Sequence, residues 1–349
     1  METIVEKIDE NKIDREKLQK AASIIREGGL VAFPTETVYG LGADALNPEA
    51  SRKIYAAKGR PSDNPLIVHI AHFEDLEKIT ADIPKKARIL GERFWPGPLT
   101  MIFAKNDRVP LATTGGLDTV AVRMPNHPIA LALIEASTGY IAAPSANTSG
   151  RPSPTLAEHV REDMTGRIPM ILDGGPVGIG LESTIVDFSE GTPTILRPGY
   201  ITREMIAGVI GEVRMDPGLS GTDGAARPKA PGMKYRHYAP RAEMILVKGQ
   251  EGPVTDTINR LVAEAMAKGK RAGIIATDES CHRYREGIVK SIGTRSNEET
   301  VAHHLFGILR EFDGLGVDVI YSESFSDAGL GQAIMNRMLK AAGHHVLQV

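Results

Sequence analysis

The sequence predicts an α/β protein in which a mixed, twisted sheet with flanking helices is followed by a smaller α/β domain. Its 349 residues exceed the usual length of one domain. Over 1–214, segments of helical period alternate irregularly with short β-rich runs, which favours a mixed sheet over a repeating doubly wound unit. A segment rich in proline and glycine, 215–241, then precedes a regular alternation of strands and helices over 242–349.

The elements of the first domain follow from apolar period and from helix breakers. Leu18, Ala22 and Ile25 share one face of a helix expected over 14–28, which two glycines end. The run GLVAFPT after them is typical of a buried strand. Further helices are expected over 49–57, 74–79, 84–93, 128–137 and 202–209, and further strands over 66–70, 99–104 and 119–124 and in PMILDG, STIVDFS and TPTILRPG.

The segment 215–241 is expected to be a linker, yet it carries tyrosines, a histidine and several cations that a passive spacer does not need. After it, EMILVK, RAGIIAT, IVKSIG and VDVIYSE are expected strands, which alternate with helices over 253–267, 297–312 and 331–342. This pattern is that of a small βαβ-type domain. Its first turn lacks GxGxxG, so a dinucleotide site has no direct support there.

Composition limits the class of protein. Hydrophobic residues make up 42% and charged residues 24%, as in ordinary globular proteins. A formal net charge of −3 without blocks of like charge argues against a surface built mainly for nucleic acid. The single cysteine, Cys281, allows no internal disulfide. Because METIVEKIDENK also lacks the apolar core of a signal peptide and no membrane span is evident, we expect a cytoplasmic protein.

The first candidate for chemistry is FPTETVYGLGADA, residues 33–45. Thr35, Glu36 and Thr37 offer two hydroxyls and a carboxylate at the end of a strand. Gly40 and Gly42 allow the backbone to approach a neighbour closely. The alternative is a plain turn whose hydroxyls cap their own backbone. Taken alone, the motif favours neither interpretation.

The second candidate is KGRPSDNPLIVH, residues 58–69. Lys58 and Arg60 flank a glycine at the end of an expected helix, where a single cation usually does no more than offset the helix dipole. Two cations beside a stiff Pro-flanked turn with Asn64 fit a substrate with several anionic groups better. His69 ends an apolar run, where a lone histidine is more often a hydrogen-bonded core residue than a ligand.

Three later stretches add polar groups. Thr119 and Arg123 lie four residues apart in an expected strand and so project from one face, although Arg123 could equally be a solvent-exposed edge residue. APSANTSGRPSPT, residues 143–155, has the small residues and hydroxyls of a phosphate-contacting loop, or of an ordinary solvent loop. Ser183 and Arg197 are expected on neighbouring short strands.

Some catalytic motifs are absent from the sequence. It contains no GxxxxGK[ST], GxSxG or HExxH, no Cys/His nucleophile pair, and no metal-ligand spacing. An enzyme built on these residues would act by positioning and charge stabilisation, with the substrate supplying the nucleophile. Phosphoryl or adenylyl transfer fits that description best.

Taken in order, FPTETVYGLGADA, KGRPSDNPLIVHI, WPGPLT, VAVRMPNH, APSANTSGRPSPT and ESTIVDF resemble the YrdC-like domain of the L-threonylcarbamoyladenylate synthase family. PGMKYRHYAP and GLGQAIMNRMLKAA resemble the long, two-domain form of that family. The resemblance therefore covers nearly the whole chain. It implies a YrdC-like catalytic domain over 1–214, a lid over the active site at 215–241 and a Rossmann-like domain over 242–349.

The resemblance also implies an activity. L-threonine, bicarbonate (or CO2) and ATP would give L-threonylcarbamoyladenylate, pyrophosphate and water, the first step of N6-threonylcarbamoyladenosine formation at position 37 of tRNA. The product would pass to the tRNA threonylcarbamoyl transferase machinery, with no membrane and no stable tRNA binding expected. Mg2+ would accompany ATP, held mostly by phosphate oxygens and water. No metal ligand from the protein is expected.

Site residues carry over by position from the family. The expected threonine contacts are Thr37, His69, Arg123, the backbone of Ala143, and Ser183. The expected nucleotide contacts are Arg60, Asn64, Thr119, Ser145, Ser153, Arg197 and Tyr235, with Lys58 beside them. Lys58 and Arg60 are the expected catalytic cations.

Two other functions remain open from the sequence. Single-domain relatives of the YrdC type have a basic face suited to double-stranded RNA, so a translation-associated RNA-binding module is one alternative; the net charge of −3 argues against it. A carbamoyltransferase is another, because the fold also occurs in hydrogenase-maturation proteins. Those proteins carry zinc-finger segments, and this sequence has no CxxC.

Overall fold

The computed structural model describes residues 1–220, 229–231 and 237–349, which form two compact units. Unit 1 consists of Met1–Ser149, Ser153–Gly178 and the described part of Glu182–Tyr235. Unit 2 consists of Gly150–Pro152, Ile179–Leu181 and the described part of Arg236–Val349. Each unit is described by itself.

Unit 1 is built on an eleven-stranded sheet in which parallel and antiparallel neighbours are mixed, as the sequence predicts. From edge to edge its strands are β1 (Ile4–Lys7), β8 (Met170–Asp173), β2 (Val31–Phe33), β3 (Gly40–Asp44), β7 (Ile141–Ala142), β4 (Ile67–His69), β6 (Thr119–Arg123), β5 (Leu99–Ala104), β9 (Thr184–Asp187), β10 (Thr194–Arg197) and β11 (Arg214–Met215).

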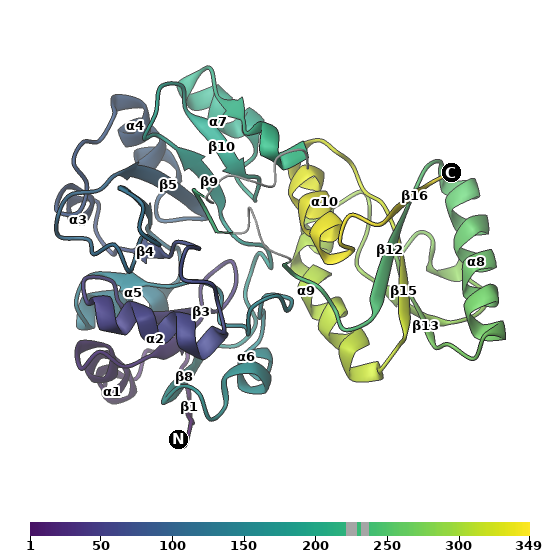
Figure 1. Ribbon diagram of the computed structural model, residues 1–349, viewed down its shortest axis with the longest axis horizontal. Coiled ribbons are helices and arrows are strands. Elements are labelled where there is room, and N and C mark those ends of the chain that lie inside the picture. Colours follow the sequence, from purple (N-terminus) through teal and green to yellow (C-terminus); the bar gives the residue numbers. More distant parts are fainter. Residues whose placement is uncertain (221–228, 232–236) are drawn as a thin grey trace. The chain divides into compact units, whose positions relative to one another are not determined.

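Helices flank this sheet (Figure 1). They are α1 (Arg15–Arg26), α2 (Pro48–Lys58), α3 (Glu74–Glu77), α4 (Lys85–Phe94), α5 (Pro128–Ala136), α6 (Ala157–Met164) and α7 (Arg203–Ile210). The ends of α2 show how the sequence defines an element. Asn47 accepts hydrogen bonds from the first-turn N–H groups, Pro48 takes the first helical position, and Gly59 ends the helix in the left-handed conformation, with φ of 62°.

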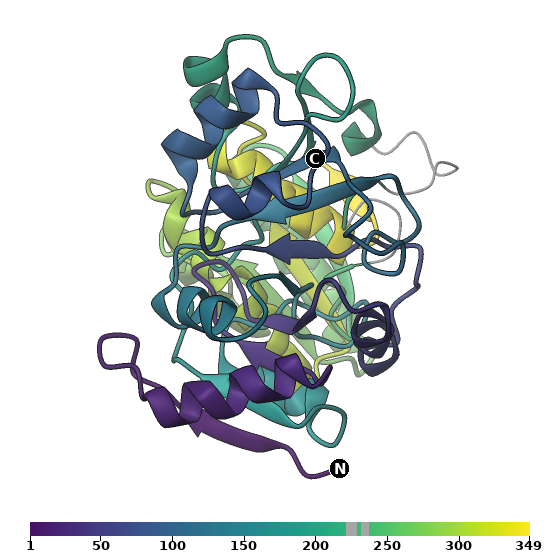
Figure 2. The same cartoon turned by 90° about the vertical axis from the view of Figure 1, so that its left-hand side faces the viewer.

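The N-terminal segment folds back on itself, so that α1 lies beside the edge strand β1 (Figure 2). Lys17 of α1 pairs with Glu6 at 3.2 Å and donates a hydrogen bond to the carbonyl of Lys7 at 2.9 Å. The apolar face of α1, which includes Leu18 and Ile25, packs in a cluster with α5 and β2. This cluster supports one side of the strands that carry the FPTETVYG motif.

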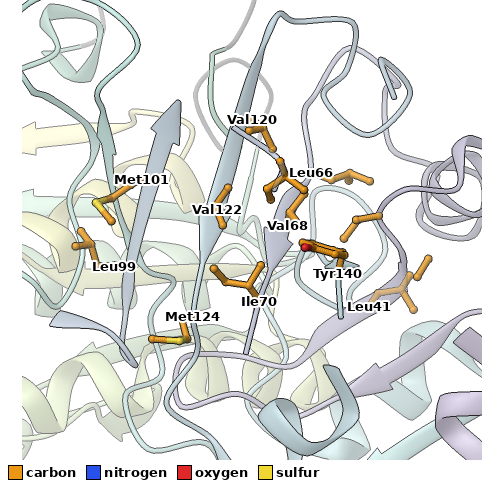
Figure 3. Close-up of a cluster of buried hydrophobic side chains, with 14 of the residues drawn as sticks. Leu41, Leu66, Val68, Ile70, Leu99, Met101, Val120, Val122, Met124 and Tyr140 are labelled. Atoms are coloured by element: carbon orange, nitrogen blue, oxygen red, sulfur yellow. The ribbon is translucent and has the colours of Figure 1, made fainter. Parts of the chain in front are cut away.

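The central strands of unit 1 use their two faces differently. Val68 of β4 and Val122 of β6 point into the large apolar cluster that Figure 3 shows, together with residues of β5 and Tyr140. Because side chains alternate along a strand, His69 and Arg123 project from the opposite face. Along β4 and β6, one face therefore packs into this core, and the other face carries polar residues that the sequence analysis singled out.

Unit 2 is a five-stranded, fully parallel sheet of order β14-β13-β15-β12-β16, which confirms the expected small α/β domain. Helix α8 covers one face and helices α9 and α10 cover the other (Figure 1). The strands are β12 (Glu243–Lys248), β13 (Ala272–Ala276), β14 (Ile288–Ser291), β15 (Val319–Glu323) and β16 (Val346–Gln348), and the helices are α8 (Glu251–Ala267), α9 (Glu298–Leu315) and α10 (Gly329–Ala341).

Several elements of the structure are not predicted from the sequence: β1, β3, β7, β11, β16 and α6. Two of them, β7 and β11, have only two residues, and β3 (GLGAD) reads as a glycine-rich turn. Long-range pairing, rather than local propensity, makes them strands. Met215, where the linker was expected to begin, still belongs to the sheet, because β11 pairs with β10. Over the described ranges, no helix is long and apolar enough to cross a membrane.

Candidate active site

Three polar residues form a row across neighbouring strands of unit 1. Arg123 on β6 is the register partner of His69 on β4 and of Thr100 on β5. Register partners project from the same face of a sheet, so the three side chains share one face. Ser183 precedes β9 by one residue, and its hydroxyl lies 2.7 Å from that of Thr100. The fold thus collects residues spread over more than one hundred positions of the sequence.

Arg123 is the centre of this group. Its guanidinium is buried and donates a hydrogen bond to Thr37 Oγ1 at 2.9 Å and another to the carbonyl of Gly97 at 3.3 Å. Its Nη2 lies 2.7 Å from a carboxylate oxygen of Glu36. The alternative reading of Arg123 as a solvent-exposed edge residue is therefore wrong.

The FPTETVYG loop divides its hydroxyls between two roles. Thr35 Oγ1 donates to the carbonyl of Val38 at 2.6 Å and accepts from the N–H of Thr37 at 3.2 Å, so it caps its own turn. Thr37 Oγ1 lies 2.9 Å from Thr35 Oγ1 and also accepts from Arg123. The turn-capping interpretation holds for Thr35, whereas Thr37 belongs to the polar group around Arg123.

His69 is a neutral imidazole. Burial, and after it the charge of Arg123, lowers the pKa of His69 to about 3. Its Nδ1 lies 3.1 Å from the carbonyl of Ile67, which fixes the proton on Nδ1 in the neutral ring. Its ring also meets the Phe33 ring edge-on, with 6.3 Å between centroids. His69 is thus a buried, hydrogen-bonded histidine, as expected for a lone histidine in an apolar run, and it lies beside Arg123.

Arg197 closes the row at the β9 end. Its guanidinium donates to the carbonyl of Ser183 at 3.0 Å and to the Ser183 hydroxyl at 3.1 Å. It also donates to the carbonyl of Pro231 at 3.4 Å. The sequence places Ser183 and Arg197 on neighbouring strands, and the structure confirms that neighbourhood.

The described segment 229–231 packs on this same face of the sheet. Ala230 is fully buried, in a cluster with Ile67, Ala121, Ile185 and two other apolar residues. Ile67 and Ala121 precede His69 and Arg123 by two positions and therefore point the same way. Lys229 lies 3.0 Å from Glu190. This part of the expected linker is thus anchored beside the row of polar residues.

The cations of KGRPSDNPLIVH are fixed by backbone carbonyls. Lys58 is buried and donates to the carbonyls of Ser145 and Asn147, so it is no ordinary solvent-exposed helix-end cation. Arg60 donates to the carbonyls of Asn64 at 3.2 Å and of its neighbour Pro65 at 3.1 Å. The amide oxygen of Asn64 is buried and accepts no hydrogen bond from the described residues. This loop therefore presents fixed positive charge together with one unused buried acceptor.

The serines of APSANTSGRPSPT meet different partners. Ser145 Oγ donates to Asn147 Oδ1 at 2.6 Å, and a bridge to Gly40 ties Ser145 to the FPTETVYG strand. Ser153 Oγ donates to Glu182 Oε1 at 2.5 Å. Lys58 contacts the carbonyls in the first half of this loop, which brings two of the sequence motifs together.

Three predicted residues stand apart. The N–H of Ala143 donates to the carbonyl of Ile67 at 2.9 Å, so a backbone contact with a substrate would use its carbonyl. Thr119 begins β6, pairs with Ala104 and has no hydrogen bond to the other predicted site residues that the structure describes. Tyr235 lies outside the described residues, as do 221–228 and the rest of 232–236 in the expected lid.

Sequence reasoning missed Thr100 and Glu182, and it named the carboxylate of Glu36 without giving it a partner. Glu36, Thr100 and Glu182 lie within quoted motifs, yet no role follows from the motifs themselves. Each is a direct partner of a predicted residue, namely Arg123, Ser183 and Ser153. The strand register identifies Thr100, because Thr100 is the partner of Arg123 when β5 pairs with β6. The other two contacts depend on loop conformations.

No group of three or more His, Cys, Asp or Glu that could hold a metal ion occurs in the described part of the chain. Around Arg123 the site offers a guanidinium, a carboxylate, hydroxyls and a neutral imidazole. Such a set suits a small zwitterion with a hydroxyl group. Arg60, Lys58 and Arg197 add cations suited to phosphate groups.

Comparisons with known protein families match both units. A family model described as "Telomere recombination" (Sua5_yciO_yrdC) matches residues 23–199. A second model, described as "Threonylcarbamoyl-AMP synthase, C-terminal domain", matches residues 201–343. The two matches together span most of the chain.

Full-length relatives and a solved structure agree with these matches. A protein of Bacillus subtilis named threonylcarbamoyl-AMP synthase is 52% identical over 99% of this chain and 98% of its own length. A Pyrococcus abyssi protein of the same name is 52% identical over 97% of each chain. The crystal structure of P. abyssi Sua5 complexed with L-threonine is similar with a TM-score of 0.94, at 51% identity over 99% of each chain.

Proposed function

The chain belongs to the threonylcarbamoyl-AMP synthase family, and we propose that the polar face of the unit 1 sheet is where it makes threonylcarbamoyl-AMP. The enzyme is a nucleotidyltransferase that catalyses the first step of threonylcarbamoyladenosine formation in tRNA. L-threonine is its amino acid substrate, and bicarbonate or CO2 and ATP are the proposed co-substrates. Pyrophosphate is the other product, together with the water that is released when bicarbonate supplies the CO2.

The observation that carries the proposal is the group around Arg123. Threonine is a zwitterion with a hydroxyl group, and its carboxylate would pair with the Arg123 guanidinium. Thr37 and Ser183 would supply hydroxyl partners, with the Ala143 carbonyl beside them. His69 stays neutral, so it adds no charge to the site. The identity of the partner in the P. abyssi complex, L-threonine, supports this assignment.

The nucleotide is proposed to lie against the other predicted residues. Arg60 and Lys58 are held by backbone carbonyls, so a triphosphate would meet charge that needs no reorganisation. Arg197 is proposed to lie between the threonine site and the nucleotide site. It donates a hydrogen bond to Ser183 and would face the α-phosphate from the threonine side. Asn64, Thr119, Ser145 and Ser153 complete this set, and Tyr235 is proposed to join it.

The chemistry needs no protein nucleophile. Threonine's amine takes up CO2 to form a carbamate, whose oxygen attacks the α-phosphate as pyrophosphate leaves. The protein contributes orientation and stabilisation of negative charge. Mg2+ is proposed to arrive with ATP and to be bound by phosphate oxygens and water.

The setting of the enzyme is part of the proposal. Its product is a labile mixed anhydride, which would pass in the cytoplasm to the machinery that transfers the threonylcarbamoyl group to tRNA. Matches over 97% or more of the chain to proteins named as synthases favour this function over an RNA-binding module.

Pyrophosphate release tests the function directly. The purified chain is supplied with ATP, and threonine and bicarbonate are each added or withheld. Release only when both are present, with threonylcarbamoyl-AMP as the co-product, is the expected result. Release that ignores threonine, or none at all alongside salt-sensitive RNA binding, would contradict the proposal.

A further inference from the structure

Glu36 is a buried carboxylate that the assignments above do not use. It follows Thr35 in FPTETVYG, between the residue that caps the turn and the residue that bonds Arg123. Its side chain is only 12% exposed, and both carboxylate oxygens are buried. A buried acidic side chain is costly unless it has a partner, so its presence here calls for a physical reason.

Arg123, the partner of Glu36, leaves most of the hydrogen-bonding capacity of the Glu36 carboxylate unused. Arg123 Nη2 lies 2.7 Å from one oxygen, but the contact does not have the directions of a hydrogen bond. Among the described residues, neither oxygen of Glu36 accepts a hydrogen bond. A carboxylate can accept about four hydrogen bonds, so this one keeps room for a donor that the protein does not supply.

The position of Glu36 matches the amine of an amino acid. In the proposed complex, the substrate carboxylate pairs with Arg123, and the nitrogen of an α-amino acid is attached one carbon away. A group beside Arg123 therefore meets that nitrogen, and Glu36 is the acidic group in contact with Arg123. Guanidinium and carboxylate together give a neutral pair that complements both charges of a zwitterion.

The surroundings leave few other groups to take a proton from the amine. His69 is neutral with a pKa of about 3, because it is buried and faces the Arg123 cation. His127, on the loop after β6, is also buried, and burial lowers its pKa; Glu10 and Glu36 oppose that shift. Neither imidazole is a competent base in this environment. Glu36 is the carboxyl group in contact with Arg123, and its buried oxygens are available to a donor.

We propose that Glu36 is a catalytic residue that binds the amine of threonine and accepts its proton during carbamate formation. This inference rests on the proposed function. The ammonium group of bound threonine first releases one proton to the solvent. The resulting neutral amine donates its lone pair to the carbon of CO2, and one C–O π pair moves onto oxygen. The nitrogen, which then carries two hydrogens and a positive charge, gives one proton to Glu36. The products are threonine carbamate and the protonated side chain, so atoms and charge balance.

The proposal separates two steps that differ in their need for Glu36. Carboxylation of the amine requires a proton acceptor, whereas transfer of the adenylyl group does not. The reverse reaction, from threonylcarbamoyl-AMP and pyrophosphate to ATP, begins with the second step alone. Free carbamate, which leaves the enzyme, breaks down in solution. The ATP yield in the reverse direction therefore reports adenylyl transfer without carboxylation.

The test compares both directions in Glu36→Gln, which keeps the shape of the side chain and removes its basicity. We expect the forward rate to fall at least about 100-fold, and the reverse rate to change less than about 3-fold. High bicarbonate at alkaline pH, where threonine carbamate forms without enzyme, should restore the forward rate. Equal losses in both directions would overturn the proposal and make Glu36 a positioning residue for Arg123. An unchanged forward rate would overturn it too.

A matched variant controls for the loss of a buried ion pair. Glu323 of β15 is a buried carboxylate paired with Arg295 within unit 2. Glu323→Gln weakens a buried carboxylate–arginine pair that also accepts hydrogen bonds from Ser280 and Tyr284. It is expected to lower the thermal midpoint without changing the ratio of forward to reverse rates. The wild-type protein separates the two hypotheses. If it releases no pyrophosphate with threonine, the proposed function fails, whereas the Glu36→Gln ratio bears on the role of Glu36 alone.

Discussion

Arg123 and His69 are register partners on the parallel strands β6 and β4, and the cation lies on the same face of the sheet as the imidazole. Burial and the Arg123 charge together hold the pKa of His69 near 3. A histidine often changes its charge near neutral pH, but His69 stays neutral there beside the Arg123 cation. Well above about pH 3, the imidazole therefore adds no charge beside Arg123.

The neutral imidazole predicts how stability depends on pH. The unfolded chain protonates His69 below about pH 6.5, whereas the folded chain resists protonation down to about pH 3. The unfolded state therefore binds more protons in this window, and this residue's contribution to stability falls as pH falls through it. His69→Gln should therefore reduce the slope of the unfolding free energy against pH. The reduction is the contribution of one proton, about 1.4 kcal/mol per pH unit. Denaturant unfolding of both proteins from pH 6.5 to 4.5 measures it, and parallel slopes would contradict the prediction.

Lys58 is predicted to matter for stability as well as for turnover. Lys58→Ala leaves the buried carbonyls of Ser145 and Asn147 without this donor, at a cost of about 1–3 kcal/mol. Pyrophosphate release should be lost in the same variant. Lys53 of the same helix α2 donates to the carbonyl of Gly28 and provides the control, because Lys53→Ala should retain turnover. Thermal unfolding and pyrophosphate release are the measurements, and a Lys58→Ala protein as active as Lys53→Ala would reject the role.

The turn after β10 tolerates no Cβ at Gly199. An added Cβ would lie 2.5 Å from the backbone nitrogen of Thr184, next to Ser183. Because a backbone atom cannot move away cheaply, Gly199→Ala should destabilise the fold by about 1–3 kcal/mol. Gly208, within α7, has open space around its Cβ position, so Gly208→Ala should stabilise by about 0.5–1 kcal/mol. Opposite shifts of the unfolding midpoint are expected, and shifts of the same sign would contradict the geometry.

The anchored segment 229–231 gives a fourth prediction. Ala230→Glu would bury a charge among the apolar side chains around Ile67 and Ala121, so the segment should detach from the sheet. Since Pro231 accepts a hydrogen bond from Arg197, the KM for ATP should rise several-fold more than the KM for threonine. Lys229→Ala removes only a partly exposed ion pair and should have little effect. Steady-state kinetics with each substrate varied will decide, and an Ala230→Glu enzyme with an unchanged KM for ATP would count against it.

Local patterns predict most helices and the core strands, because their signals lie within a few residues. The helix expected over 49–57 is α2, and the structure shows its cap at Asn47 and its end at Gly59. β3 and β11 could not be found in this way, since a glycine-rich run and a two-residue strand exist only through their partners. The elements that the sequence predicts carry local signals, whereas the others depend on their pairing with a neighbouring strand.

The site shows the same division. Thr37, His69, Arg123, Ser183 and Arg197 were predicted through a family resemblance, and the structure brings them together. The contacts of Glu36 and Thr100 could be identified only from the structure, because they depend on which side chain each residue faces. The contacts of Tyr235 with nucleotide stay a prediction. A motif indicates which residues are present, but only the pairing of strands shows which of them are neighbours.

The register of β1 has a consequence for how the chain is made. Ile4 pairs with Met170, and Thr3 donates a hydrogen bond to the carbonyl of Ile168 at 2.6 Å. During synthesis, the first strand therefore emerges long before its partner exists, and it must wait with unpaired backbone groups. Its short length and its charges, as in Glu6 and Lys7, protect it from pairing with other chains during that interval. The amino-terminal strand is thus the first to leave the ribosome, yet it pairs only after β8 has followed it.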